Sequence, residues 1–562
     1  MKFSKILTTA FVALGATIAL SGCIRETFPK ESTITQEQLG SVAPDVLAEN
    51  LLKGIPRGML APAYGGWEHT DFGVPSVGVY NDHAAQIICT NGWMLGNAPA
   101  YNRFYMSSWG KGYGANSWMP VHYWFSYYPQ IKSCNDVILR LQGMEGTDSY
   151  VAIARTYRAL FYLDLARLFE CLPANAPNNA AYEDQQYQAQ GLTVPIVDEV
   201  MVADPKAEEL AKNNPRATRE EIFNFILEDL AFAEEAMSSE DYRITNNTDP
   251  TLPVVYGLKA RVYLWLGGFE DGLSGELPAG NEAYALAAEY ARKAITAFGG
   301  AVMTEKEWTD PITGFNTKAS SWMWTLFHST DTVAGNLHNF VAHMAPEAEF
   351  GYCPYTQPGL GSNYFERLGK SDFRRKLVVD PNGNYNSFKA YTQMSEDEYK
   401  GLAPYTFFKF RPAQGHRTDY ATAAAIAIPL MRCEEMYFIE MEAVTHTQGV
   451  DAGWALLDEF MRANRDANYK FYTNDYLDEI IFQKGIEFWG EGIMMFDYKR
   501  LNKGIDTKYE GTNYDPNRRF KTDVRVPWWT YCIPQGEVQM NTALKGLNNP
   551  DPSMTLKSKD EM

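Results

Sequence analysis

Apolar residues recur every three to four positions in eight segments of this chain, with charged residues between them. Since 3.6 residues complete one helical turn, this spacing places the apolar side chains on one face of a helix. Between Tyr150 and Phe169, for example, Tyr157, Phe161 and Leu165 alternate with arginines. The pattern predicts helices over residues 121–141, 150–169, 218–237, 254–266, 281–298, 430–444, 452–464 and 476–489.

The ends of several of these helices carry recognisable signals. Thr218 and Glu221 have the spacing of a capping box, in which each residue satisfies a free backbone N–H at the start of a helix. Gly267-Gly268 and Gly299-Gly300 follow two of the apolar runs, and glycine is the residue that most readily ends a helix. These signals fix the start of the 218–237 helix and the ends of two others.

The predicted helices come in pairs, with alanine and glycine at positions where two helices would touch. Small residues let paired helices approach closely, as in tetratricopeptide-like repeats. Insertions break the 34-residue period of such repeats. The fold class expected is mostly α, with about four helix pairs around residues 121–300 and 429–500.

Two regions lack this periodicity, around residues 60–120 and 301–428, and both are expected to be rich in loops. Trp322-Met323-Trp324 reads as a short strand with both indoles on one face. Long irregular segments in a compact protein usually carry function. Functional residues are therefore expected in these two regions.

The N-terminus has the features of a leader. Lys2 and Lys5 precede an apolar run over residues 6–20, which ends at Leu20-Ser21-Gly22-Cys23. A cysteine directly after the small residues resembles a bacterial lipoprotein signal, with Cys23 becoming a lipid-bearing N-terminus. The alternative is an ordinary secretory signal with a chance cysteine. The expected organisation is a signal peptide over 1–22 and a single body over 23–562.

Net charge and cysteine content restrict the classes of protein to which this chain can belong. Without Lys2 and Lys5, 48 basic residues remain against 69 acidic ones, a net charge of −21. Such a chain repels nucleic acid and gives no support for binding it. Beyond Cys23 there are six widely spaced cysteines, without CxxC pairs. Buried free thiols are expected, with a single disulfide left open.

The sequence contains none of the common catalytic motifs. There is no His-Glu-x-x-His, no Gly-x-Ser-x-Gly, no phosphate loop and no dinucleotide fingerprint. His338 and His343 are five positions apart, which suits two sides of a helix better than one metal ion. The carboxylates are so numerous that the sequence does not single out an acid/base pair for glycoside hydrolysis. These absences shift the balance from an enzyme towards a binding protein.

Aromatic residues provide the positive signal. Seven rings lie within the 26 residues from Trp93 to Trp118, about twice the chain average, and they alternate with asparagine and glycine. An aromatic ring can cover the apolar face of a sugar while amide side chains bond its hydroxyls. The candidate ring plates are Trp93, Tyr101, Trp109, Tyr113 and Trp118, and the candidate hydroxyl partners are Asn97, Asn102 and Asn116.

A second aromatic set provides further candidates, namely Trp322, Tyr352 and Tyr355. For any one of these rings, packing in the core is the more common role. Rings on predicted helices, such as Trp124 and Tyr128, are expected to pack between helices.

Several ordered motifs carry a family resemblance. Residues 154–169 fit an "RA-aromatic-aromatic-x-DL-x-RLF" segment, and 258–264 fit an "A-R-V-Y-L" helix. Residues 432–443 fit "R-x-x-E-x-x-L-I-x-A-E-A", and 485–500 fit an "E-L-x-x-E-G-x-R-x-x-D-L-x-R" pattern. With 128–138, 217–222 and the tail at 533–550, these motifs extend over some 400 residues behind the leader. In this order the chain resembles the SusD/RagB family of outer-membrane lipoproteins.

The resemblance implies a function. Members of this family are expected to have a mostly helical fold of four tetratricopeptide-like units with an irregular, loop-rich ligand-binding half, and to be binding proteins, not enzymes. They capture oligo- or polysaccharide at the cell surface and deliver it to a SusC-like TonB-dependent transporter. No cofactor is implied, and a structural calcium ion is left open.

The chain departs from the family pattern at three places. Lys484-Gly485 stands where paired arginines are common, Gly492-Ile493 replaces Gly-x-Arg, and residues 24–30 lack a dense acidic run. The last departure leaves the outward orientation resting on the family alone. Two alternatives remain: the same architecture binding a peptide or glycopeptide, and an extracellular glycoside hydrolase of helical build.

Overall fold

The computed structural model describes residues 44–63, 69–90, 114–174, 179–242, 244 and 248–555. Residues 51–562 form one compact unit and residues 1–50 form another. In the smaller unit the described residues belong to the start of helix α3 (Pro44–Leu52). The expected boundary between leader and body, at 22/23, lies outside the described residues. So do Cys23 and six of the predicted ligand-binding residues: Trp93, Asn97, Tyr101, Asn102, Trp109 and Tyr113.

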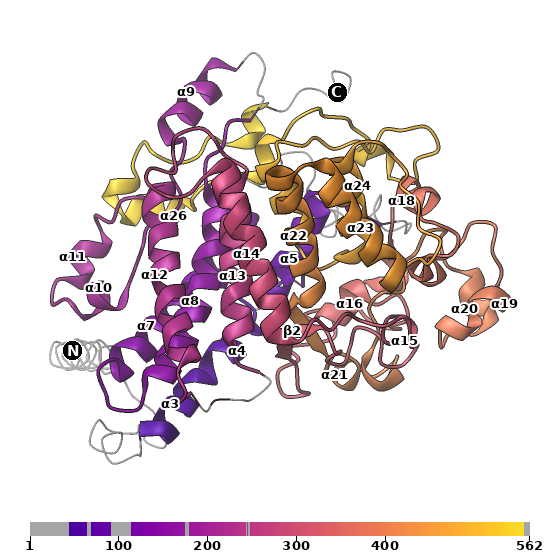
Figure 1. The fold of residues 1–562 in the computed structure, drawn as a ribbon, viewed down its shortest axis with the longest axis horizontal. Helices are drawn as coiled ribbons and strands as arrows, with labels where there is room; N and C mark the ends of the chain where they lie inside the picture. The colour runs from indigo at the N-terminus through magenta and orange to yellow at the C-terminus, as the bar shows by residue number, and fades with distance from the viewer. Residues whose placement is uncertain are drawn as a thin grey trace, which may run out of the picture. The chain divides into compact units, whose positions relative to one another are not determined.

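Long helices packed side by side form one half of the larger unit (Figure 1). Each long helix contacts the next along the chain, and α14 continues the series onto α22 across the irregular region. This arrangement confirms the mostly helical fold class. The helices of this half are α4 (Gly54–Met59), α5 (Val74–Ala84), α7 (Trp118–Leu141), α8 (Asp148–Phe169), α9 (Ala180–Ala189), α10 (Glu199–Ala203), α11 (Ala207–Ala211), α12 (Arg219–Ser238), α13 (Leu252–Gly267), α14 (Gly280–Phe298), α22 (Cys433–Gln448), α23 (Val450–Asn464), α24 (Tyr476–Glu487), α25 (Met494–Arg500) and α26 (Gln535–Met540).

The predicted helix signals act as expected. The Thr218 hydroxyl accepts a hydrogen bond from the Glu221 backbone N–H, and the Glu221 carboxylate accepts one from the Thr218 N–H in return. Helix α14 ends at Gly299, whose φ of 91° lies in the left-handed region that glycine adopts without strain. Local chemistry therefore determines these helix ends.

Small residues set the close packing of α13, α14 and α22. The α14 face turned to its neighbours carries four fully buried alanines. On α13, a Cβ atom at Gly257 would lie 3.2 Å from Met436 Sδ of α22, and one at Gly267 would lie 2.8 Å from the Tyr284 ring of α14. The helices approach this closely because no side chain separates them.

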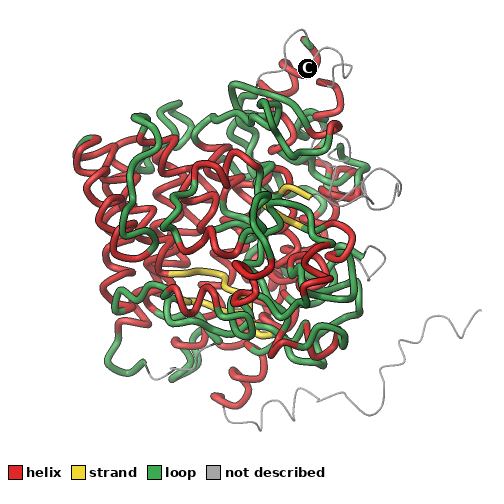
Figure 2. Tube along the Cα trace, turned by 90° about the vertical axis from the view of Figure 1, so that its right-hand side faces the viewer, coloured by secondary structure: helices red, strands yellow, loops and turns green. Residues whose placement is uncertain are grey.

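The other half of the unit is irregular. Figure 2 shows the long helices gathered on one side and loops with short helices on the other. The short helices are α15 (Glu305–Thr309), α16 (Phe340–Met344), α17 (Cys353–Thr356), α18 (Ser362–Arg367), α19 (Tyr385–Phe388), α20 (Glu396–Lys400) and α21 (Tyr420–Ala423). The strands are β1 (Cys89–Thr90), β2 (Trp322–Phe327), β3 (Pro358–Gly359) and β4 (Ala427–Arg432).

Strand β2 confirms the strand expected at residues 322–324, and its partner corrects one helix boundary. The strand pairs with β4 in antiparallel register, with an irregularity around Trp324. The predicted helix at 430–444 therefore begins at Cys433, because Leu430 to Arg432 complete the ladder of β4. Periodicity alone does not reveal this switch, since apolar residues in a buried strand and in a buried helix look alike.

Two further observations concern the region 60–120 and the cysteines. Helix α5 lies inside the region expected to be loop-rich, and ten of its eleven residues are buried. The cysteines Cys89, Cys134, Cys171, Cys353, Cys433 and Cys532 are buried free thiols. In the described part of the chain, no helix is long and apolar enough to cross a membrane.

Candidate ligand-binding site

A small sheet brings together the two irregular regions. Strand β1 pairs with β3, with Thr90 opposite Pro358 and Cys89 opposite Gly359. Gly359 also lets a third segment approach β3, since a Cβ atom there would lie 2.2 Å from the Tyr405 carbonyl oxygen. Thr90, the last described residue before the predicted first aromatic set, therefore lies beside Pro358, just after α17, the helix that carries Tyr355.

A cluster of aromatic and imidazole rings lies next to this sheet. His69 Nδ1 is 2.5 Å from the Tyr352 hydroxyl, and the His338 ring meets His69 edge-on with 5.1 Å between centroids. The buried His343 ring packs 4.9 Å from Tyr352, and its Nε2 lies 2.9 Å from the Leu337 carbonyl oxygen. Burial lowers the pKa of His343 to about 4, so it is a neutral donor at pH 7.

Two further rings are exposed, one on α17 and one on α21. Tyr355 in α17 is 42% exposed, and Tyr420 at the start of α21 is 39% exposed. The Phe350 ring lies edge-on to Tyr420, with 6.4 Å between centroids. We call His69, His338, Phe350, Tyr355 and Tyr420 the aromatic surface.

Charged side chains hold part of the aromatic surface in place. The Arg417 guanidinium pairs with Glu398 and lies 3.3 Å from Glu349. The Glu349 backbone N–H donates to the Arg417 carbonyl at 2.9 Å. Ring faces beside carboxylate and guanidinium groups combine apolar contact with directional hydrogen bonding, which suits a polyhydroxylated ligand.

Trp118 and Asn116 lie at the other end of the first irregular region. Trp118 is half-buried and stacks on His122, with 4.6 Å between centroids and 9° between planes. His122 Nδ1 lies 3.7 Å from Asp71, which also accepts from the Ala63 and Gly73 N–H groups. Trp118 is therefore bound into the packing around α5. Asn116 is exposed and lines a separate polar hollow with Gln185, Asn548 and Asp551.

Two of the predicted second-set rings are not at the surface. Trp322 is fully buried in β2, and its indole N–H donates to Met303 Sδ at 3.3 Å. Tyr352 is 4% exposed and supports His69 through its hydroxyl. In this structure neither ring offers a face to a ligand, because tertiary contacts cover both. Tyr355 alone of this set is exposed.

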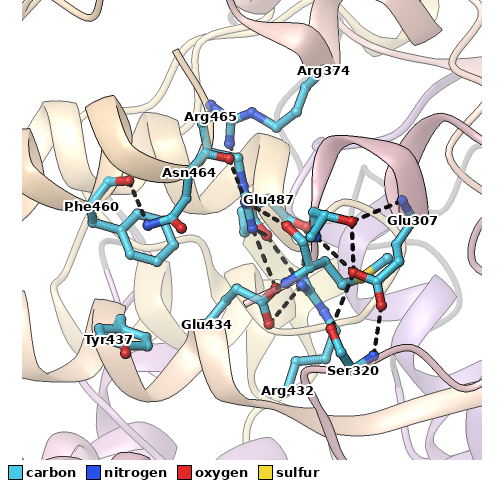
Figure 3. A network of polar contacts seen from close by, with 12 residues as sticks. Glu307, Ser320, Arg374, Arg432, Glu434, Tyr437, Phe460, Asn464, Arg465 and Glu487 are labelled. Carbon is cyan, nitrogen blue, oxygen red and sulfur yellow. Dashed lines mark hydrogen bonds and ion pairs between the residues drawn. The ribbon is translucent and has the colours of Figure 1, made fainter. Parts of the chain in front are cut away.

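The motif residues of the C-terminal half form a buried ion network (Figure 3). Glu487 accepts from Arg465 at 2.8 and 2.9 Å, from Arg432 at 3.1 Å and from Arg374 at 3.2 Å. Arg465 and Arg432 also pair with Glu434, at 3.3 and 3.2 Å. In this network four cations (Arg374, Lys409, Arg432 and Arg465) face four carboxylates (Asp372, Glu434, Glu487 and Glu491), and all are buried or nearly so.

This network is structural in character. Burial by itself opposes ionisation of Glu487, but Arg465, Arg432 and Arg374 outweigh it and hold the pKa of that carboxyl well below its usual range. Glu434 and Glu487 are both fully buried, so a substrate cannot reach them. Both glutamates of the "E-x-x-x-E" pattern at 487 and the arginine of the "R-x-x-E" pattern at 432 belong to this network, whereas Glu435 pairs with Arg261. Charge pairing within the core thus explains both patterns.

Among the described residues, no group of three or more histidine, cysteine or carboxylate side chains is arranged to hold a metal ion. The His338 ring meets His69 edge-on, whereas the His343 ring packs against Tyr352 and its Nε2 faces the Leu337 and His69 carbonyl oxygens.

Sequence reasoning missed several residues of the aromatic surface. His69 lies far in the sequence from its partner Tyr352, and Tyr420 lies far from its partner Phe350. The available signal was the run Phe350-Gly351-Tyr352 followed by Tyr355, in which a glycine with φ of 70° lies among rings outside any helical period.

Helix pairs on one side and an irregular, ring-bearing half on the other define a class of helical ligand-binding proteins. Two family models match the chain: one described as "Starch-binding associating with outer membrane" over residues 82–264, and one described as "SusD family" over residues 324–551. The chain belongs to the SusD/RagB family.

Solved structures agree with this assignment at the level of the fold. A SusD-like carbohydrate-binding protein from Bacteroides vulgatus is 18% identical, with a TM-score of 0.64 over 89% of this chain and 96% of that one. A SusD superfamily protein from Bacteroides thetaiotaomicron is 19% identical, with a TM-score of 0.63 over 91% and 100%. Surface glycan-binding protein A from Bacteroides fluxus is 15% identical, with a TM-score of 0.55 over 91% and 100%. No curated protein sequence matches the chain significantly.

Proposed function

We propose that this protein captures oligo- or polysaccharide at the cell surface and passes it to a SusC-like TonB-dependent transporter in the outer membrane. One observation carries the proposal. Exposed rings, Tyr355 and Tyr420 among them, reach the surface of the irregular half, and Tyr355 lies in the helix directly before β3, the strand that pairs with β1. Family membership and two similar structures, one of a carbohydrate-binding protein and one of a surface glycan-binding protein, support the same function.

The chemistry of the aromatic surface suits a sugar better than a highly charged ligand. A tyrosine ring covers the C–H face of a pyranose, and neighbouring amide, imidazole and carboxylate groups exchange hydrogen bonds with its hydroxyls. The Arg417 charge is already paired with two carboxylates, Glu349 and Glu398. This guanidinium group is therefore not left to bind an anionic ligand.

The proposal includes anchoring and partnership. Cys23 would carry the lipid after removal of residues 1–22, leaving a single body over 23–562. The helical half would face the transporter and the irregular half would hold the glycan. The protein would act as a binding protein and not as an enzyme, which fits the burial of Glu434 and Glu487 behind arginine side chains.

Calorimetric titration of residues 24–562 against a panel of host and plant polysaccharides tests this function. We expect saturable binding to one glycan class without release of shorter sugars. Binding to peptides or glycopeptides alone would replace the glycan proposal with that of a peptide-capturing relative. Release of shorter sugars would favour a hydrolase.

Ring substitutions then test the site. Removing one stacking ring costs on the order of 1–3 kcal/mol when bases stack on proteins, and a similar loss is expected for Tyr355→Ala and for Tyr420→Ala. Tyr187→Ala is the matched control, because Tyr187 is 79% exposed but lies on α9, on the other side of the unit (Figure 1). Alanine at Trp93, Tyr101, Trp109 and Tyr113 extends the test to the predicted first set. Unchanged affinity in all of these variants would overturn the assignment.

A further inference from the structure

A second pocket lies on the helical half, along one face of α7. Phe125 and Tyr128, three positions apart on that helix, line it, and the buried Trp124 ring packs behind Tyr128 with 4.4 Å between centroids. Its other walls come from the segment around Pro195, from α11 and from α26. The hollow has a volume of about 370 Å³, which is within the size range of small-molecule sites. The aromatic surface shares no residue with it.

Glu537 gives this pocket its charge. The side chain lies on α26, is half-buried, and has no hydrogen bond or ion pair within the part of the chain that the structure describes. Burial raises the pKa of Glu537, and its charge is close enough to Tyr128 to contribute, after burial and Tyr162, to the raised pKa of that phenol. A carboxylate at the edge of three rings is thus without a counter-ion.

The other polar groups of the pocket already have partners. The Tyr128 hydroxyl donates to the Pro195 carbonyl at 2.7 Å. The Asn541 side-chain N–H donates to the Asn214 carbonyl at 2.5 Å, and that of Asn214 donates to the Ile196 carbonyl at 2.7 Å. Lys132 also lines the pocket, but its ammonium group is bound to Asp136 at 2.7 Å. Among the described residues of the pocket, the Glu537 carboxylate is therefore the group that a positively charged ligand would neutralise.

We propose that this pocket binds an organic ammonium group, held against the rings of Phe125 and Tyr128 and neutralised by Glu537. Aromatic faces carry negative potential and attract cations within about 6 Å of the ring centroid. A carboxylate in the same pocket adds a charge-assisted contact. A bulky, weakly hydrated ammonium group meets both requirements and loses little hydration on entry. A neutral sugar would leave the Glu537 charge unbalanced.

Choline and its neutral carbon isostere 3,3-dimethyl-1-butanol distinguish charge from shape. We expect residues 24–562 to bind choline in a calorimetric or NMR titration and to bind the neutral isostere at least about tenfold more weakly. N-acetyl-lysine amide in a parallel titration tests whether the ammonium group of a protein side chain is accepted as well. Equal binding of choline and the isostere, or binding of neither, would overturn the proposal.

Variants locate the site. Glu537→Gln preserves shape and should weaken choline binding about tenfold, while Glu537→Asp should restore part of it. Phe125→Ala removes an exposed ring of the pocket and should also weaken binding, independently of any change at Glu537. Glu510→Gln, at an exposed carboxylate outside the pocket, is the matched control. Retained choline affinity in both Glu537→Gln and Phe125→Ala would place the binding elsewhere and refute the assignment.

Discussion

Replacing Glu487 with glutamine tests whether the buried ion network holds together the C-terminal half. The substitution keeps the size and shape of the side chain but removes its charge. Three guanidinium groups, from Arg374, Arg432 and Arg465, lie within 2.8–3.2 Å of the Glu487 carboxylate. In the variant, the four cations of the network face three carboxylates, and the excess charge is buried.

Removing one partner of a buried ion pair costs about 3–5 kcal/mol, because the other partner stays buried without compensation. We expect a loss of that size in the free energy of unfolding of Glu487→Gln at pH 7. The matched control is Glu305→Gln. Glu305 pairs with Lys376 at 2.5 Å, but their side chains are 51% and 41% exposed, so a loss below about 1 kcal/mol is expected.

The pH dependence provides a second readout. The pKa of Glu487 is lower in the folded than in the unfolded state. Its contribution to the free energy of unfolding is therefore complete above the unfolded pKa of about 4.3 and is lost as pH falls towards the folded pKa. The difference between wild type and Glu487→Gln should therefore shrink below about pH 4. Urea titrations followed by tryptophan fluorescence at pH 7 and at lower pH measure it. A loss no larger than that of Glu305→Gln, or one independent of pH, would refute the reasoning.

Three further changes test local features by the same urea titration. Thr218→Ala removes the capping box of α12 and should cost about 1 kcal/mol, whereas Thr251→Ala, at a helix start without a side-chain cap, should cost little; equal losses would contradict the capping argument. Gly299→Ala forces alanine to a φ of 91° and should cost about 1 kcal/mol, while Gly54→Ala, with open space around it and no positive φ, should be near neutral. Burial lowers the pKa of Lys499 to about 7. Unfolding therefore takes up a proton between about pH 7 and 10, and the free energy of unfolding rises with pH across that window. Lys499→Met should flatten this rise, and an unchanged slope would exclude Lys499 as its source.

The sequence by itself determined much of the helical half. Apolar periodicity located α7, α8, α12, α13 and α14 to within a few residues, and Thr218, Glu221 and Gly299 fixed helix ends. These features depend on interactions between residues a few positions apart, which a single sequence displays directly. The ordered motifs likewise identified the family.

Only the tertiary structure decided which rings are exposed. Trp322 and Tyr355 look equivalent in the sequence, yet one is covered by Phe315 and Met303 and the other is exposed. Likewise, the switch from strand to helix at Arg432 follows from the pairing of β4 with β2, more than a hundred residues away. Burial and strand pairing are set by contacts between distant segments, and local periodicity carries no information about them.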